Sequence, residues 1–188
     1  MKCEDVSAVI LAGGRSSRMG VSKAELPWDG TTLLLHQLRK LRALGIRDLI
    51  VCGSVHVEGA KSVTDIYPQK GPLGGIHAGL LAAKRESVLV TGVDTPLVPE
   101  RIYRELIAAH TGGSTVLAHG DKLEPLIAVY DRSLIPTAEE LLLAGRCSVR
   151  GLLNEAWTKR FLCPLDEKLL CDCNTPEDYA AALKLRGI

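Results

Sequence analysis

Residues 11–23 have the composition of a phosphate-binding loop. They read Leu-Ala-Gly-Gly-Arg-Ser-Ser-Arg-Met-Gly-Val-Ser-Lys and directly follow an apolar segment. Gly13 and Gly14 let backbone N–H groups approach an anion with no Cβ in the way. Three cations of this loop can neutralise phosphate oxygens, namely Arg15, Arg18 and Lys23. Glycines and cations at the end of a strand predict chemistry on a triphosphate.

The spacing within this loop argues against two common nucleotide-binding motifs. Val21 follows Gly20 where a Walker A loop has Lys and then Ser or Thr, and the Gly-x-Gly-x-x-Gly spacing of dinucleotide folds does not occur. Kinase-like and dehydrogenase functions are therefore disfavoured. The remaining alternative is a glycine-rich turn with solvated arginines. It is disfavoured because the cations follow the apolar segment so closely.

Two aspartates stand at the ends of predicted strands. Asp94 follows the apolar run 87–93, and ligands of open α/β sheets bind at the carboxyl ends of the strands. Mg²⁺ prefers one or two carboxylates together with substrate phosphates, so Asp94 is the candidate metal ligand. Asp65 ends a shorter run, and its oxygens could accept hydrogen bonds from a base or a ribose. The alternative for both aspartates is a capping or turn role.

The elements that must position these residues alternate along the first 113 residues. Apolar runs predict strands at 6–11, 48–52, 62–66 and 87–93. Periodic apolar residues predict helices at 32–44, 76–85 and 99–110, with a loop at 67–75 before the second of them. This order predicts an α/β fold in three layers. Its sheet is doubly wound and mostly parallel, with helices on both faces and right-handed crossovers.

The pattern changes after residue 113 and predicts a mixed sheet. Segments 114–119 and 123–130 flank a hairpin turn, and 160–165 has the pattern of a further strand. Helices are predicted at 134–144 and 148–156, and a last helix begins with Thr175 as N-cap and Pro176 in the first turn. No repeat or linker divides the chain, so residues 1–188 are expected to form one domain.

Composition excludes several classes of protein. The net charge is +1 and the isoelectric point is near 7.6, so no overall field favours nucleic acid or an anionic membrane. The apolar runs are shorter than the roughly 20 residues of a membrane span. The N-terminus lacks the pattern of an export signal, and the six cysteines are scattered. We therefore expect a cytoplasmic protein with reduced thiols and no structural zinc.

Several motifs together resemble one family. The stretch 172–178 reads Asp-Cys-Asn-Thr-Pro-Glu-Asp, residues 71–75 read Gly-Pro-Leu-Gly-Gly, and Asp94 begins Asp-Thr-Pro. With the opening Leu-Ala-Gly-Gly-x-x-x-Arg-Met-Gly-x-x-Lys, the chain resembles the molybdenum cofactor guanylyltransferases over nearly its whole length. The opening is shared by a wider nucleotidyltransferase superfamily, whereas the combination with Gly-Pro-Leu, Asp-Thr-Pro and Asn-Thr-Pro narrows the match.

The resemblance implies a Rossmann-like nucleotidyltransferase fold and a reaction. GMP would pass from GTP to molybdenum-loaded molybdopterin, giving the guanine dinucleotide cofactor and pyrophosphate. Residues up to about 113 would mainly bind GTP, and residues of about 114–188 the acceptor. The implied GTP contacts are Leu11, Ala12, Gly13, Gly14, Lys23, Asp65 and Asp94. The implied catalytic residues are Arg18, Lys23 and Asp94, with Asp94 holding Mg²⁺ and Asn174 lying toward the pterin.

The chain departs from the family pattern at two places. Asp172 stands where the family has Asn, and its carboxylate would repel an anionic acceptor unless it is metal-bound or turned away. Cys52-Gly53-Ser54 stands where family members carry Asn, so no base contact is assigned there. Alternatives are a CTP-dependent molybdopterin cytidylyltransferase, a sugar-phosphate nucleotidyltransferase and a non-catalytic delivery module for nucleotide or molybdopterin. We expect a monomer that docks transiently with cofactor-biosynthesis or client molybdoenzymes.

Overall fold

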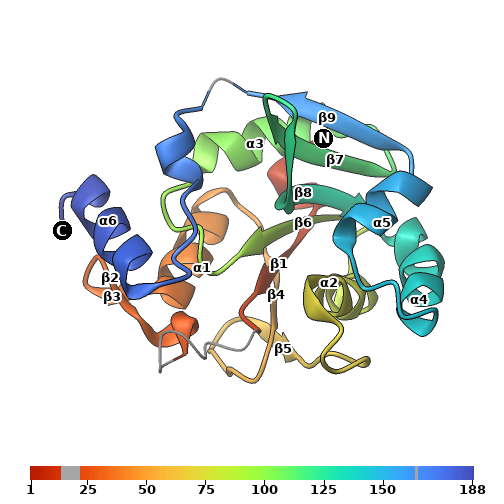
Figure 1. Ribbon diagram of the computed structural model, residues 1–188, viewed down its shortest axis with the longest axis horizontal. Coiled ribbons are helices and arrows are strands. Elements are labelled where there is room, and N and C mark those ends of the chain that lie inside the picture. Colours follow the sequence, from red (N-terminus) through yellow and green to blue (C-terminus); the bar gives the residue numbers. More distant parts are fainter. Residues whose placement is uncertain (14–21, 164) are drawn as a thin grey trace.

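The computed structural model describes residues 1–13, 22–163 and 165–188. In this part of the chain, seven strands form one sheet in the order β5-β4-β1-β6-β8-β7-β9 (Figure 1). The strands are β1 (Ser7–Leu11), β4 (Asp48–Cys52), β5 (Lys61–Val63), β6 (Ser87–Gly92), β7 (Ser114–His119), β8 (Lys122–Asp131) and β9 (Thr158–Leu162). Strand β8 runs antiparallel to β6 and β7, and the other neighbours are parallel. The predicted mostly parallel, mixed sheet is confirmed.

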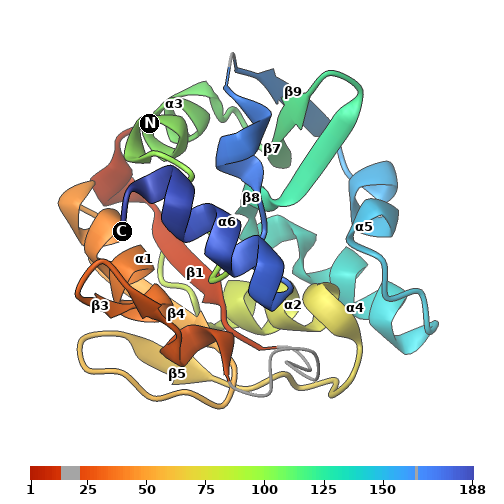
Figure 2. The ribbon, with the colours of Figure 1, turned by 60° about the vertical axis from the view of Figure 1, so that its left-hand side comes forward.

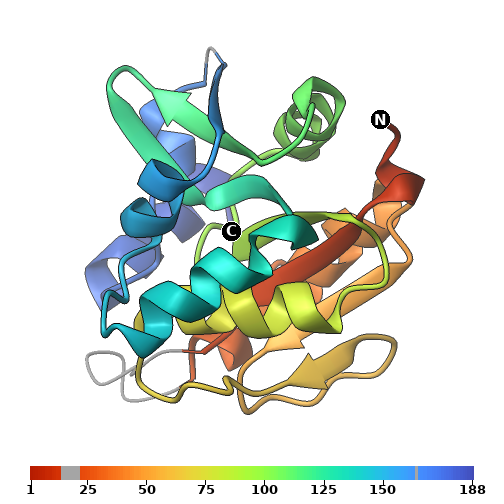
Figure 3. The ribbon, with the colours of Figure 1, turned by 90° about the vertical axis from the view of Figure 1, so that its right-hand side faces the viewer.

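Helices cover both faces of this sheet. One face packs against α1 (Leu33–Ala43) and α3 (Glu100–Ala109), and α6 (Pro176–Arg186) joins the apolar cluster on this side of the sheet. The other packs against α2 (Gly71–Ala82), α4 (Ile135–Leu143) and α5 (Val149–Glu155), with α2 and α4 side by side (Figure 3). All five residues of β1 are buried, because a central strand between two helical layers has no solvent face. The three-layer architecture predicted from the alternation is present.

Local sequence accounts for the ends of the helices near the site. Thr32 caps α1 by accepting a hydrogen bond from the Leu35 amide. Thr175 and Asp178 form a capping box at the start of α6, with Pro176 in its first turn. Helix α6 ends at Gly187, whose φ of 81° suits glycine. The capping box fixes the direction in which the chain enters α6 from Asn174.

Helix α6 crosses the outside of α1 and a two-stranded ribbon formed by β2 (Pro27–Trp28) and β3 (Thr31–Thr32) (Figure 2). The Arg186 guanidinium donates to Asp29 at 2.8 Å, and the Tyr179 hydroxyl donates to the Pro27 carbonyl. The ribbon was not predicted. Its turn is Asp29-Gly30 with positive φ at both residues, which is a typical hairpin signal.

Several predicted boundaries were wrong. The helix expected at 76–85 ends at Ala82, and the strand expected at 160–165 runs over Thr158–Leu162. The loop expected at 67–75 ends at Lys70, and α2 begins at Gly71. Proline is tolerated in the first turn of a helix, because backbone N–H groups there have no partner within the helix, so Pro72 does not prevent the helix from starting. The strand expected at 62–66 is β5 and ends at Val63, which leaves Asp65 in the connection that follows it. Among the described residues, no helix combines the length and the apolar character needed to cross a membrane.

Candidate functional site

A cavity of about 760 Å³ lies at the carboxyl ends of the central strands. Leu11 ends β1 and pairs with Cys52 of β4 on one side and with Gly92 of β6 on the other. The described residues that line the cavity come from these strand ends, the start of α2, β8 and the segment before α6: Leu11, Gly13, Cys52, Asp65, Gln69, Gly71, Pro72, Gly75, Gly92, Asp94, Leu126, Asp172 and Asn174. This is the edge at which open α/β sheets bind ligands.

Small residues bring α2 close to the sheet at this edge. A Cβ on Gly79 would lie 2.7 Å from a methyl of Val9, and one on Gly75 would lie 3.0 Å from the Leu11 side chain. The Cys52 thiol donates to the Gly75 carbonyl at 3.2 Å. Close packing of helix on strand therefore places the first turn of α2, with its unpaired N–H groups, on the wall of the cavity.

Asp65 lies against this first turn of α2. Its carboxyl oxygens are 3.3 Å and 3.6 Å from the positions that a Cβ would take on Gly74 and Gly75. Burial raises the pKa of Asp65. Burial, with the nearby Asp65 charge, also raises the pKa of the Cys52 thiol to about 12, so this thiol is neutral at physiological pH. One half of the cavity thus places the Asp65 carboxyl group beside an apolar wall.

In the other half of the cavity, two lining residues, Asp94 and Asn174, are joined by Lys23. The Lys23 amine donates to Asp94 Oδ2 at 2.9 Å and to Asn174 Oδ1 at 2.6 Å. The amide of Cys173 donates to the Asp94 carbonyl at 2.8 Å, which ties the segment before α6 to the end of β6. Lys23 and Asp94 keep 18% and 22% of their side-chain surface exposed, so solvent reaches both side chains. The structure therefore brings together residues from three distant motifs.

Gly92 lies directly beneath the Asp94 carboxylate. A Cβ there would come within 2.5 Å of Asp94 Oδ1, so a side chain at residue 92 would displace the carboxylate. Sequence reasoning did not single out Gly92. Its only signal is the position two residues before the strand-end aspartate.

Asp172 also lines this half of the cavity, so it is not turned away from the site. Solvent reaches the side chain, yet partial burial raises its pKa to about 6, together with the negative charges of Asp94 and Glu124. The positive charges of Lys23 and Lys122 oppose this increase. The two carboxylates share one wall, and the negative charge of Asp94 makes the ionised form of Asp172 less favourable.

The donor set fits Mg²⁺ shared with a substrate. Among the described residues, no group of three or more His, Cys, Asp or Glu side chains could enclose a metal by itself. Asp94 and Asp172 instead offer two carboxylates beside an open cavity, and Mg²⁺ sites commonly combine one or two carboxylates with phosphate oxygens and water.

Of the remaining predicted residues of the glycine-rich loop, some are described by the structure and some are not. Ala12 and Gly13 follow β1 directly, and the Ala12 amide donates to the Cys52 carbonyl at 2.8 Å. Gly13 lines the cavity, whereas Gly14, Arg15 and Arg18 lie outside the described residues.

Besides Gly92, two further lining residues were not predicted from the sequence, Gln69 and Leu126. Gln69 lies in the segment before α2 and has a φ of 65°. The many turn-forming residues of this segment are the sequence signal that could have marked it. Leu126 lies beside Pro125, where the pairing of β7 with β8 shifts register between Val116 and Leu117. Proline has no N–H to donate to a neighbouring strand, so Pro125 was the residue in the sequence that could have indicated this irregularity.

The sheet carries Asp94 at its carboxyl edge, with Lys23 bonded to it. Residues 8–160 match the family model of the MobA-like NTP transferase domain, so the chain is a nucleotidyltransferase. More particularly, the chain belongs to the molybdenum cofactor guanylyltransferases. It is 33% identical to the probable molybdenum cofactor guanylyltransferase of Carboxydothermus hydrogenoformans over 97% of both chains. It is 34% identical to the molybdenum cofactor guanylyltransferase of Xanthomonas euvesicatoria over 93% of this chain and 92% of that one.

A solved structure supports the fold. Molybdopterin-guanine dinucleotide biosynthesis protein A from Archaeoglobus fulgidus superposes with a TM-score of 0.76 at 24% identity, covering 97% of this chain and 99% of that one. The predicted nucleotidyltransferase fold is confirmed by this similarity.

Proposed function

We propose that this enzyme transfers GMP from GTP to molybdenum-loaded molybdopterin, forming the guanine dinucleotide cofactor and pyrophosphate. The observation that carries the proposal is the contact of Lys23 with both Asp94 and Asn174, which line one cavity of about 760 Å³. Family membership narrows this geometry to the guanylyl reaction, and both relatives described above carry that name.

GTP would bind with its nucleoside in the half of the cavity near Asp65. Leu11, Ala12 and Gly13 would contact the nucleoside and the first phosphate, beside the N–H groups at the start of α2. The Asp65 carboxylate accepts hydrogen bonds only, so it suits guanine N–H groups or ribose hydroxyls. The triphosphate would then extend toward Lys23 and Asp94, and the acceptor would approach from the side of Asn174 and β8.

The chemical step would be an in-line displacement at the α-phosphorus of GTP. An oxygen of the acceptor phosphate forms the new P–O bond, the bond between the α-phosphorus and the bridging oxygen breaks, and pyrophosphate leaves with that electron pair. The acceptor oxygen is already ionised, so no general base is required. Catalysis then depends on positioning two anions and on neutralising their charge.

Lys23 would supply part of this neutralisation. Its amine can exchange a bond to Asp94 or Asn174 for a phosphate oxygen, because both present partners lie at the cavity. Arg18 and the backbone of Gly14 are proposed to act on the same phosphates. Asp94, with Asp172 beside it, would hold Mg²⁺, which when bound stabilises the charge of the leaving pyrophosphate.

The free thiols of all six cysteines suit a reducing compartment, and we place the enzyme in the cytoplasm. We further propose that it acts as a monomer, binds neither nucleic acid nor membrane, and docks transiently with enzymes that make or use the cofactor.

Pyrophosphate release with Mg²⁺-GTP or Mg²⁺-CTP, in the presence of molybdate-loaded molybdopterin, tests the proposal. We expect turnover with GTP, none with CTP, and none for Asp94→Ala. Asp121→Ala removes a fully exposed carboxylate on the 119–122 turn and serves as the matched control with normal turnover. A preference for CTP would overturn the guanylyl assignment while leaving the phosphate chemistry in place. Normal turnover of Asp94→Ala would overturn the role of Asp94.

A further inference from the structure

Helix α1 holds the turn that carries Asp94. Three side chains near the middle of this helix, His36, Gln37 and Lys40, donate hydrogen bonds to backbone carbonyls of residues 92–96. None of the three lines the nucleotide cavity, and none was singled out from the sequence. Their shared target is the connection between β6 and α3, in which Asp94 is the residue that faces Lys23.

Gln37 makes the central contact of this set. Its side chain is fully buried, and Nε2 donates to the Gly92 carbonyl at 2.9 Å and to the Thr95 carbonyl at 3.1 Å. These two carbonyls flank Asp94 on either side, so one amide group holds both ends of the turn. Thr95 Oγ1 also donates to the Gly92 carbonyl at 3.2 Å. The turn is thereby fixed from its inner side.

The oxygen of the Gln37 side-chain amide makes no hydrogen bond with the described residues. This oxygen, Oε1, is buried. An unsatisfied buried acceptor costs free energy, and an apolar residue of similar size would fill this place in α1 without that cost. Packing alone therefore does not explain a glutamine here, whereas its two donated hydrogen bonds do.

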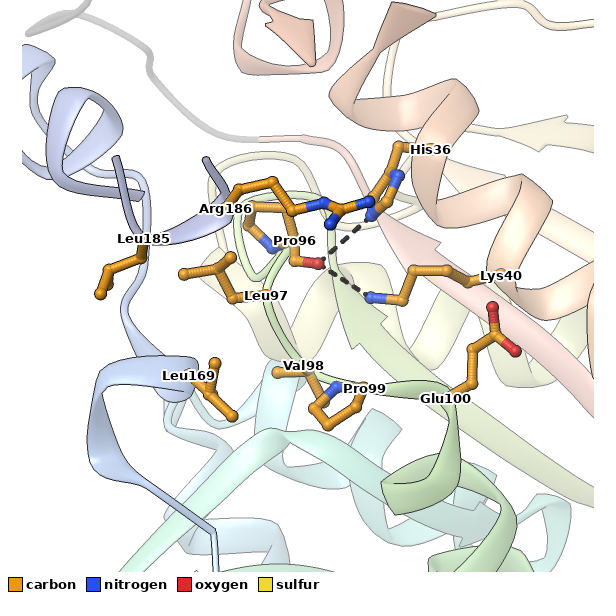
Figure 4. Close-up of a pocket in the computed structure, with 10 residues that line it drawn as sticks. All are labelled: His36, Lys40, Pro96, Leu97, Val98, Pro99, Glu100, Leu169, Leu185 and Arg186. Carbon is orange, nitrogen blue, oxygen red and sulfur yellow. Dashed lines mark hydrogen bonds between the residues drawn. The ribbon is translucent and has the colours of Figure 1, made fainter. Parts of the chain in front are cut away.

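His36 and Lys40 extend the contact to the next residues of the turn. Both donate to the Pro96 carbonyl, from Nε2 of His36 at 3.3 Å and from the Lys40 amine at 3.1 Å (Figure 4). They line a second cavity of about 400 Å³, whose lining shares no residue with the cavity that contains Asp94 (Figure 4).

We infer that Gln37 is a positioning residue that fixes the direction of the Asp94 carboxylate toward the metal and the phosphates, an inference that rests on the proposed function. The carboxylate lies directly over Gly92, whose carbonyl Gln37 binds, so a shift of this peptide moves the carboxylate. Side chains that orient a metal ligand from behind contribute strongly to metal affinity, typically about 10- to 100-fold.

Gln37→Met tests this role, because Met keeps the length of the side chain and removes both donors. Hydrogen exchange of the amides of residues 93–98 in the free protein reports on the turn. Electron paramagnetic resonance of Mn²⁺ with GTP reports on the metal site. We expect about tenfold weaker Mn²⁺ binding and faster exchange in the turn. Leu41→Ala is the control, because it creates a cavity on the same helix and leaves these hydrogen bonds in place.

Each outcome decides the inference. Weaker Mn²⁺ binding in Gln37→Met but not in Leu41→Ala supports it, and unchanged Mn²⁺ binding in a folded Gln37→Met variant overturns it. If Gln37→Met does not fold, Lys40→Met provides the second test, with faster exchange of the Leu97 amide expected and unchanged exchange contradicting the role of α1. Unchanged Mn²⁺ binding in Asp94→Ala would instead overturn the metal role of Asp94, and the Gln37 assignment with it.

Discussion

Replacing the buried Lys40 by Met is expected to stabilise the protein at neutral pH. The residue is only 7% exposed, and its amine donates to the Pro96 carbonyl and lies 5.3 Å from the centre of the Tyr103 ring. Burial lowers the pKa of Lys40 from 10.5 to about 7, and the Glu100 charge only partly opposes this. The charged amine is therefore less favourable in the folded protein than in the unfolded chain.

The size and sign of the effect follow from these values. The difference between 10.5 and about 7 corresponds to about 5 kcal/mol of unfavourable free energy when the amine is charged in the folded state. The lost hydrogen bond and ring contact offset about 2 kcal/mol of this in the Met variant. Between pH 7 and pH 10.5 the unfolded chain binds more protons, so Lys40 makes the free energy of unfolding increase with pH.

Urea denaturation between pH 7 and pH 8.5 measures this effect. The free energy of unfolding of the wild type should rise by about 1–2 kcal/mol more than that of Lys40→Met, and the variant should be the more stable protein at pH 7 by about 2 kcal/mol. The range lies above the lowered pKa of His36 and below the raised pKa of Tyr103, the neighbouring groups that titrate. Lys84→Met, at an exposed lysine, is the control. Parallel pH profiles for wild type and Lys40→Met would refute the reasoning.

Two further predictions concern the site and the packing around it. Asp172→Asn should raise the Mg²⁺ concentration for half-maximal pyrophosphate release several-fold, because one of two carboxylates on that wall loses its charge. An unchanged Mg²⁺ requirement with a lower KM for molybdopterin would mean that Asp172 only repels the acceptor. Gly79→Ala should lower the free energy of unfolding by about 1–3 kcal/mol, because its Cβ would meet the methyls of Val9 at 2.7 and 2.8 Å. A thermal melt unchanged from wild type would contradict this.

Much of the fold could be predicted because the local sequence pattern of each element matches its burial and contacts in the folded protein. The central strand Ser7–Leu11 is apolar throughout, as a strand covered on both faces requires. Thr175, Pro176 and Asp178 mark the start of the last helix within four residues. The errors lie where a local signal has two outcomes, as at Gly71-Pro72, where the same residues suit a loop or a first helical turn.

The candidate site was predictable only in part. Lys23, Asp94 and Asn174 were selected from three separate motifs, and their approach to within hydrogen-bond distance depends on the path of the chain into α6. Gly92 and Gln37 carry no recognisable motif, because their importance arises from contacts made in three dimensions. Asp172 was recognised as a departure, but its place beside Asp94 could be known only from the structure.

The central claim is that GMP itself becomes part of the product. Incubation of the protein with Mg²⁺, molybdate-loaded molybdopterin and GTP labelled at the α-phosphorus tests it most directly, with the product separated and weighed by mass spectrometry. We expect a labelled guanine dinucleotide of molybdopterin, with one pyrophosphate released for each molecule formed. Label that remains in GTP, or that appears only as free GMP, would contradict it.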